Sequence, residues 1–260
     1  VLFISTTDLD IHVSWSSNFI GLDNYVKALT KDSLFYFTLW NSLIWTVGCV
    51  AGFFFVGLGL ALLMNQRFKG RALVRGMVFI PWVTPIVVAL LGWKWVLHGD
   101  WGLYNNLLRS FGLLSEMSTI EWITDPNYTW ASLIYVNVWK GYAFSYVMFL
   151  AALQTIPLEL YESAKIDGAG ALNAFRYITW PLLRPVALVL LLLQTNWTLM
   201  NFETIWLFLE GGPGYYTTTF APYVYLLSLK FWRFGYGSAV GMIGLAFSLV
   251  FTIIYIRYLR

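Results

Sequence analysis

Charged residues are scarce in this sequence, and their scarcity indicates the class of protein. Asp, Glu, Lys and Arg make up 11% of the 260 residues, whereas an ordinary globular protein carries roughly 25%. A chain with so few charged groups could not cover its surface in water. Hydrophobic residues make up 59% of the sequence, and the mean hydropathy is +0.66. The composition excludes a soluble enzyme and indicates a protein of the lipid bilayer.

Residues that support catalysis or metal binding are also few. The single cysteine, Cys49, lies in an apolar run, which excludes a disulfide framework and a cysteine-based metal site. His12 and His98 are far apart and lack the spacing of metal ligands. The sequence contains no Gly-x-x-x-x-Gly-Lys-Ser/Thr phosphate loop. We therefore expect no catalytic residue, no metal site and no cofactor bound by this chain itself.

Five apolar runs are long enough to cross a bilayer, which takes roughly 20 helical residues. They cover residues 37–65, 76–97, 130–154, 181–209 and 236–258. Their hydrophobicity is continuous rather than alternating, which favours helices over a barrel. Val1 to Ile4 resemble the end of a truncated first span, followed by an external segment up to residue 36. The sequence predicts an all-α, polytopic helical bundle of about six spans, with residues 37–260 as the transmembrane domain.

The basic residues predict the orientation of this bundle. Arg67, Lys69, Arg71 and Arg75 cluster between the first two runs, and such clusters lie on the cytoplasmic side. By alternation, residues 7–31, 99–128 and 210–234 face outward, and residues 157–180 form a cytoplasmic connection. The net charge is only +3 and the basic residues are scattered, so no nucleic-acid partner is expected.

The cytoplasmic connection has the pattern of a helical elbow. Pro157 suits the first turn of a helix, and Gly168 suits its end. Residues 171–179 can form a second helix, and Pro181 opens the next span. An elbow held outside the lipid by a span at each end suits the docking of a partner. From the residues alone, an ordinary helix on the membrane surface is the alternative.

The same connection resembles a known motif. Tyr161, Glu162, Ser163 and Ala164, followed by Asp167, Gly168 and Ala169 and later by Ile178 and Pro181, resemble the EAA loop of ATP-binding-cassette import permeases. The form is similar to the carbohydrate subclass related to the maltose permease. Residues 19–25, 211–213, 217–219 and 235–237 resemble other segments of that subclass, so the likeness covers nearly the whole chain from Phe19. Ser163 departs from the pattern, because alanine is commonest there.

The resemblance implies the type I importer permease fold and a coupling role for seven residues: Tyr161, Glu162, Ser163, Ala164, Asp167, Gly168 and Ala169. It implies a multi-pass protein of the bacterial or archaeal plasma (inner) membrane. The implied partners are a second homologous permease, a dimer of ABC ATPases that holds ATP and Mg, and an external or periplasmic solute-binding protein. The implied function is import of a sugar or oligosaccharide, with hydrolysis performed by the partner ATPase.

Two polar stripes inside the predicted spans are candidates for the substrate pathway. At helical spacing, one contains Asn137, Lys140, Gly141 and Phe144, flanked by Trp139 and Tyr142, and the other contains Gln194, Trp197, Thr198 and Asn201. Amides and hydroxyls can pair with sugar hydroxyls, while aromatic faces pack against the CH faces of a sugar ring. Contacts between helices are the alternative interpretation. The resemblance favours the pathway, because it places Asn137, Gly141, Thr198 and Asn201 at a central cavity.

Lys140 is costly at the centre of a bilayer, at roughly 2.5–3.5 kcal/mol on insertion scales. It therefore needs a partner, either Glu203 or a negatively charged substrate such as an acidic sugar. Asn196 and Glu203 lie on the face opposite the second stripe and are expected to meet another helix or subunit. The competing function is an ion-gradient-driven secondary transporter. An intramembrane enzyme is a third interpretation, but the sequence offers no catalytic constellation for it.

Overall fold

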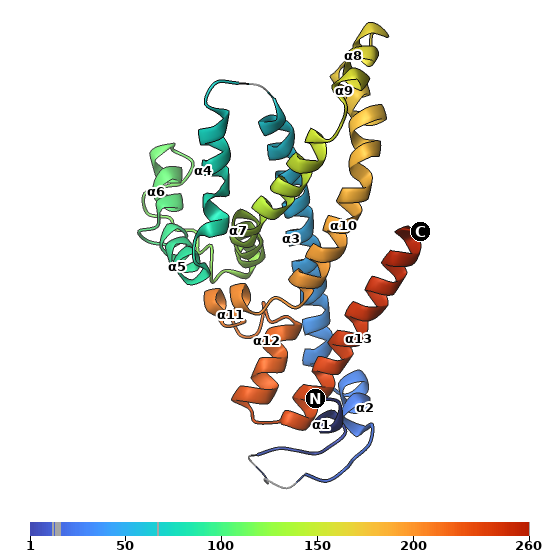
Figure 1. The fold of residues 1–260 in the computed structure, drawn as a ribbon. Coiled ribbons are helices and arrows are strands. Elements are labelled where there is room, and N and C mark those ends of the chain that lie inside the picture. The colour runs from blue at the N-terminus through green and yellow to red at the C-terminus, as the bar shows by residue number, and fades with distance from the viewer. Residues whose placement is uncertain (12, 14–16, 67, 260) are drawn as a thin grey trace.

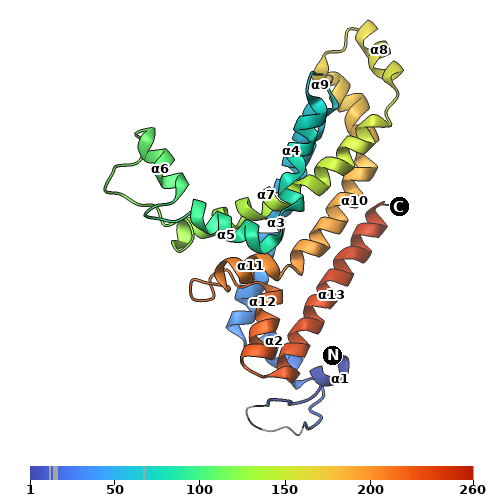
Figure 2. The ribbon, with the colours of Figure 1, turned by 60° about the vertical axis from the view of Figure 1, so that its left-hand side comes forward.

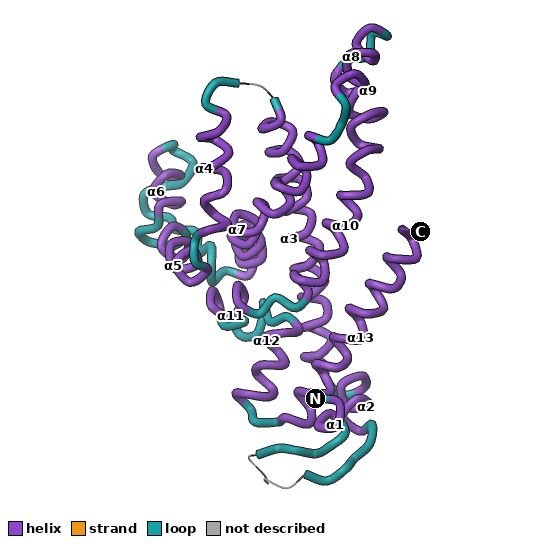
Figure 3. Tube along the Cα trace, in the orientation of Figure 1, coloured by secondary structure: helices purple, strands orange, loops and turns teal. Residues whose placement is uncertain are grey.

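The computed structural model describes residues 1–11, 13, 17–66 and 68–259, and helices make up most of this part of the chain (Figure 3). His12, Arg67 and Arg260 lie outside the described residues. The helices are α1 (Leu2–Ser5), α2 (Asp23–Thr30), α3 (Ser33–Asn65), α4 (Arg71–Val83), α5 (Ile86–Val96), α6 (Leu103–Ser110), α7 (Pro126–Gln154), α8 (Leu158–Ile166), α9 (Ala171–Ala174), α10 (Trp180–Leu199), α11 (Glu203–Leu209), α12 (Phe220–Tyr225) and α13 (Phe234–Leu259). Two π-helical turns, η1 (Phe175–Thr179) and η2 (Leu226–Lys230), complete the order.

The predicted helical membrane bundle is confirmed. Among the described residues, three helices are long and apolar enough to cross a membrane: α3, the continuous helix Ala171–Leu199 and α13. Two bent pairs, α4 with α5 and α7 with α8, also qualify when each pair is taken together. The predicted runs 37–65, 130–154 and 236–258 fall within α3, α7 and α13. Helices α8 and α9 lie at one end of the molecule, and α1 and α2 lie at the other (Figure 1).

The predicted span over residues 76–97 is present as a bent pair of helices and not as one continuous helix. Helix α4 ends at Val83, and α5 leaves it at an angle of 96°. Pro85 explains the break, because it has no N–H to donate and its ring disfavours helical geometry at the preceding residue. Thr84 is accordingly extended, with ψ of 127°. The break turns α5 across the bundle, toward α7 and α11 (Figure 2).

The predicted span over residues 181–209 is present, but its helix ends ten residues before the end of the apolar run. Helix α10 ends at Leu199, and α11 begins at Glu203. The side chain of Asn201 stabilises the second start, because its Oδ1 accepts the N–H of Thr204 at 3.2 Å, as in a helix cap. At the other end, the second helix of the elbow continues into the span through η1. We call this continuous helix, Ala171–Leu199, the α9–α10 rod.

Glycines bring α3 and α7 into close contact. A Cβ at Gly48 would lie 2.6 Å from Ile134, and one at Gly52 would lie 2.3 Å from Val138. A Cβ at Gly57 would lie 2.4 Å from the Cβ of Ser145 and 2.9 Å from the backbone nitrogen of Tyr146. Small residues allow membrane helices to approach closely and to gain van der Waals contact. The three glycines of α3 therefore determine how closely α3 and α7 can pack.

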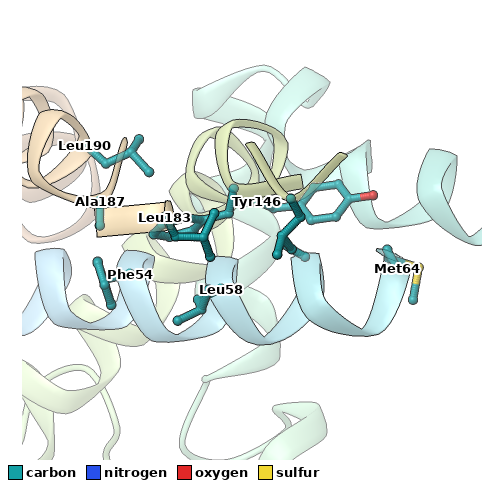
Figure 4. Close-up of a cluster of buried hydrophobic side chains, with 10 residues drawn as sticks. Phe54, Leu58, Met64, Tyr146, Leu183, Ala187 and Leu190 are labelled. Carbon is teal, nitrogen blue, oxygen red and sulfur yellow. The ribbon is translucent and has the colours of Figure 1, made fainter. Parts of the chain in front are cut away.

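The α9–α10 rod packs onto this helix pair through apolar side chains. Phe54 and Leu58 of α3, Tyr146 of α7, and Leu183 and Leu190 of the rod form one buried cluster (Figure 4). The rings of Phe54 and Phe149 meet edge-on at 5.2 Å, an arrangement that aromatic pairs favour. The cluster fixes the rod against α3 and α7 on the side that the sequence assigns to the cytoplasm.

The connection over residues 210–234 is more ordered than a surface loop. Thr217, Thr218 and Thr219 are buried, and the amide of Asn41 donates to the carbonyls of Tyr216 at 2.9 Å and Thr218 at 3.0 Å. The chain then forms α12 and η2, which pack against α13. This segment is folded into the bundle because α3 supplies partners for its backbone.

Asp32 ties this end of the bundle together. Its carboxylate accepts the N–H of Phe35 at 3.0 Å and the hydroxyls of Tyr223 and Tyr236. Burial alone would raise the pKa of Asp32, but the hydrogen bonds from the two tyrosines and the backbone outweigh it and hold the pKa below the usual value. The charged carboxylate therefore joins the start of α3 to α12 and α13.

The α3–α7 interface gives a direct test of this packing. We expect Gly57→Ala to destabilise the protein by about 1–3 kcal/mol, because the added methyl group must displace the backbone of α7. Gly59→Ala is the control, because a Cβ at Gly59 meets nothing within 4 Å. Thermal unfolding in detergent measures both variants. Equal midpoints for the two would contradict the close packing.

Candidate functional site

The two predicted stripes converge on one cavity. Its volume is about 120 Å³, and it lies between α3, α4, α7, the α9–α10 rod and the turn before α11. Seven of the ten predicted pathway residues line it: Asn137, Gly141, Phe144, Gln194, Trp197, Thr198 and Asn201. The helical spacing of the residues within each stripe thus correctly indicated which faces of α7 and the rod meet at the cavity.

The polar wall of the cavity contains an acceptor without a partner. Gln194 is 3% exposed, and its Nε2 donates to the hydroxyl of Ser145 at 2.7 Å. Its Oε1 is buried and accepts no hydrogen bond within the described chain. On the same wall, Asn137 Oδ1 accepts the hydroxyl of Thr204 at 3.0 Å. A buried acceptor without a partner is unfavourable. The Gln194 oxygen has less than 1 Å² of accessible surface, so the cavity wall must move before that oxygen can accept a hydroxyl from a molecule in the cavity.

Another part of the cavity lining is aromatic. The ring of Phe144 stacks on Trp82 at a centroid distance of 5.9 Å and an interplanar angle of 20°. The ring of Trp197 also meets that of Phe144, edge-on, at a centroid distance of 5.2 Å. Aromatic faces of this kind pack against flat, partly apolar molecules. The cavity therefore combines an amide wall with an aromatic wall.

The remaining three pathway residues fasten α7 to its neighbours. Trp139 meets the ring of Trp93 on α5 at 5.4 Å, and the Tyr142 hydroxyl donates to the carbonyl of Val78 on α4 at 2.8 Å. The ammonium group of Lys140 donates to the carbonyl of Trp82 at 2.8 Å. Lys140 therefore stands beside the cavity wall rather than within the cavity lining.

Of the two other intramembrane polar residues, Asn196 and Glu203, the structure shows a partner helix for Asn196. Within the described residues, the ion pair present joins Asp10 to Arg233, so none joins Lys140 to Glu203. Glu203 is exposed. Asn196 meets another helix as expected, because its Oδ1 accepts the hydroxyls of Ser248 at 2.5 Å and Thr252 at 3.3 Å on α13.

Sequence reasoning missed two residues of the cavity wall. Phe53 on α3 and Trp82 on α4 lie in continuous apolar runs, where one face cannot be told from another by hydropathy. The role of Phe53 is visible only in the structure, where its ring fills the space that a side chain at Gly141 would need, 2.3 Å from the ideal Cβ. For Trp82, the break at Pro85 was the signal, since helix ends often border cavities.

The elbow forms as its sequence predicts. Helix α8 ends in a Schellman motif, in which the N–H of Ala169 reaches the carbonyl of Ala164 at 2.8 Å and that of Gly168 reaches Lys165 at 3.1 Å. Gly168 has φ of +77°, which glycine adopts without strain. The angle between α7 and α8 is 69°. The seven predicted coupling residues therefore lie on a short helix and its turn, at the end of the molecule.

The elbow is exposed on several sides. Glu162, Ser163 and Asp167 face solvent, as does Ile166, which is 87% exposed. Leu172, at the start of the rod, is 79% exposed. Tyr161 and Ala164 are half-buried on the other flank. Exposed apolar and acidic side chains together suit contact with another protein. Among the described residues, no group of three or more His, Cys, Asp and Glu side chains lies in an arrangement for a metal ion.

The Schellman motif depends on the glycine. We expect Gly168→Ala to strain the turn by roughly 1–2 kcal/mol, because a Cβ is unfavourable at positive φ. The N–H of Ala169 should then exchange with solvent faster. Hydrogen exchange of the peptide covering residues 158–172, followed by mass spectrometry, measures the effect. Gly170→Ala is the control, since its φ is negative and a Cβ there meets nothing; equal acceleration in both would contradict the motif.

Comparisons with known proteins agree with this arrangement. The model of the family described as binding-protein-dependent transport system inner membrane component matches residues 53–258. The sulfoquinovosyl glycerol transport system permease protein of Agrobacterium fabrum is 37% identical over 100% of this chain and 83% of its own length. The trehalose/maltose transport system permease protein of Thermococcus litoralis is 34% identical over 92% of this chain and 79% of its own length.

A solved structure shares the fold. A bacterial ABC transporter described as involved in the import of the acidic polysaccharide alginate matches with a TM-score of 0.83 and 28% identity, over 92% of this chain and 83% of the solved chain. The predicted likeness to sugar import permeases related to the maltose permease is confirmed. The chain belongs to the family of binding-protein-dependent transport system inner membrane components.

Proposed function

We propose that this chain is the membrane-spanning permease subunit of an ATP-binding-cassette importer that moves a sugar or oligosaccharide into the cytoplasm. The observation that carries the proposal is the cavity, which Gln194 lines together with the aromatic residues Phe144 and Trp197. This combination suits sugar hydroxyls and sugar ring faces. The names of the relatives, which include permeases for trehalose, maltose and sulfoquinovosyl glycerol, support the same class.

In this proposal the energy comes from a partner ATPase. Closure of two ATPase subunits moves the elbow, and the chain rocks against a second, homologous permease so that the cavity opens to one side at a time. A solute-binding protein delivers the sugar outside. One solved relative is described as being in complex with an alginate-bound periplasmic protein. Glu162, exposed on α8, is suited to accept hydrogen bonds or an ion pair from the ATPase.

The first experiment measures ATP hydrolysis in proteoliposomes by the complex that copurifies with this chain. Trehalose and alginate oligosaccharides serve as neutral and acidic probes, each with and without the candidate binding protein. We expect hydrolysis to rise with one of them, and Glu162→Ala to abolish that rise. Glu159→Ala is the matched control, because it removes another carboxylate of α8 outside the motif.

The alternative outcome is equally specific. If no ATPase copurifies and uptake follows an imposed ion gradient, the chain works as a secondary transporter and the proposal fails. If Glu159→Ala and Glu162→Ala act alike, the motif carries no particular role in coupling.

Lys140 favours an acidic carbohydrate within this class. Its ammonium group uses one donor on the carbonyl of Trp82, a residue of the cavity wall, and a lysine has three donors. The names of two relatives concern charged substrates: one is a sulfoquinovosyl glycerol permease, and the other takes part in the import of an acidic polysaccharide. A positive charge beside the cavity would attract such a molecule as it enters.

We expect Lys140→Gln to reduce uptake of the acidic probe roughly fivefold, as the loss of about 1 kcal/mol from a partly exposed charge pair implies. Uptake of the neutral probe should fall less. Lys230→Gln is the control, because Lys230 also lies 6.0 Å from a tryptophan ring but that ring, Trp206, is outside the cavity lining. Equal losses for both probes would remove the preference for acidic sugars.

A further inference from the structure

A hydrogen bond joins α8 of the elbow to the α9–α10 rod, the long helix whose other end lines the cavity. The hydroxyl groups of Tyr161 on α8 and Thr179 lie 2.9 Å apart. Thr179 is the last residue of η1 and is 4% exposed, whereas the flank of α8 around Tyr161 is half-buried. The bond therefore lies at the inner angle of the elbow, where α8 folds back toward α9 (Figure 2).

Helix α8 has few other attachments. Among the side-chain hydrogen bonds of the described residues, this is the one that joins α8 to another helix, and the ion pair present lies elsewhere. The covalent link to the rod covers residues 167–170 and contains Gly168 and Gly170, at neither of which a Cβ would meet another atom. Such a link can pivot. The Tyr161–Thr179 hydrogen bond restricts the angle between α8 and the rod, which the two glycines alone would leave free to vary.

Thr179 stands at a special point of the rod. In η1 the N–H of Trp180 donates to the carbonyl of Phe175, and the Thr179 hydroxyl lies 3.5 Å from the carbonyl of Ala174. The π-helical turn comes directly before Pro181, whose ring removes one backbone donor. Long helices tend to kink at π-bulges. Tyr161 contacts the rod at such a turn rather than along its regular portion.

The other end of the rod reaches the cavity. From Thr179 to Gln194 the helix rises by about 22 Å, at 1.5 Å per residue. There Gln194 donates to Ser145 on α7, and the indole N–H of Trp45 on α3 donates to the carbonyl of Thr198 at 3.1 Å. Thr179 and two residues of the cavity wall, Gln194 and Thr198, therefore lie on one continuous helix.

We propose that Tyr161 and Thr179 are a positioning pair that locks the elbow to the α9–α10 rod, so that movement of α8 shifts the cavity wall instead of bending the glycine link. The inference rests on the proposed import function and adds to it the contact through which the two sites communicate. Neither residue needs to touch the sugar or ATP. The pair acts because its hydrogen bond keeps α8 and the rod at a fixed angle across the glycine link.

The first test measures geometry and does not depend on the substrate. Spin labels on Ile166→Cys and Leu172→Cys, both highly exposed positions, report the angle between α8 and the rod in nanodiscs. We expect one narrow distance distribution for the labelled chain, and a distribution at least twice as broad after Thr179→Val or Tyr161→Phe. Thr179→Ser, which keeps the hydroxyl, should restore the narrow distribution. Unchanged widths in both variants would overturn the proposal.

The second test measures coupling in the complete complex, as the ratio of sugar-stimulated to unstimulated ATP hydrolysis with trehalose and alginate oligosaccharides. We expect Thr179→Val and Tyr161→Phe each to lower this ratio threefold or more, and the double variant to lower it no further, since both remove one bond. Tyr177→Phe is the control, because Tyr177 is 69% exposed and lies in the same turn.

The outcomes separate the two proposals. The import function is contradicted if the wild-type complex contains no ATPase, or if neither sugar changes its rate of ATP hydrolysis. A complex that is stimulated normally in all variants contradicts the positioning pair alone. If the variants lose the copurifying ATPase, the two residues serve docking rather than transmission, and the proposal is overturned. The proposal is also overturned if Thr179→Ser, which keeps the hydroxyl, does not retain the wild-type ratio of stimulated to unstimulated hydrolysis.

Discussion

The close approach of α3 and α7 is the constraint on which the rest of the structure depends. It exists because Gly48, Gly52 and Gly57 leave room for the facing side chains of α7. In lipid, helices gain little from the hydrophobic effect, so such contact is a main source of cohesion. The two helices together form the surface on which the rod packs. The cavity borders this interface, since Gly141 lies against Phe53 and Gly141 also lines the cavity.

Much of this arrangement could be predicted from the sequence, and the failures have a common cause. Helical spacing placed Asn137 with Gly141, and Gln194 with Thr198, because the period of an α-helix fixes which residues share a face. Hydropathy did not predict the helix breaks at Thr84 and Asn201, because apolar residues continue on both sides of each break. The capping role of Asn201 and the position of Pro85 were local signals that outweighed the continuity of the run.

The breaks and the cavity depend on one another. Asn201 lines the cavity and also accepts the N–H of Thr204 in the first turn of α11, so the end of the rod and the cavity wall are the same few residues. On the other side, Trp82 lines the cavity just before α4 ends at Val83. Irregular backbone is tolerated at membrane depth only where it borders protein or a hollow. Residues such as Phe53 and Thr179 could not be assigned from sequence, because their roles come from neighbours far along the chain.

Asp32 gives the end of the molecule opposite the elbow a particular resistance to acid. Its carboxylate holds α3, α12 and α13 together and keeps a pKa below the usual value, after the opposing effect of burial is overcome. A depressed pKa means that the stabilisation is present at neutral pH and is lost only as the pH falls through that lowered value. The positive-inside rule predicts that this end faces outward. Moderate acidification of the surroundings, to about pH 5, leaves the carboxylate charged, and the three helices stay joined at this end.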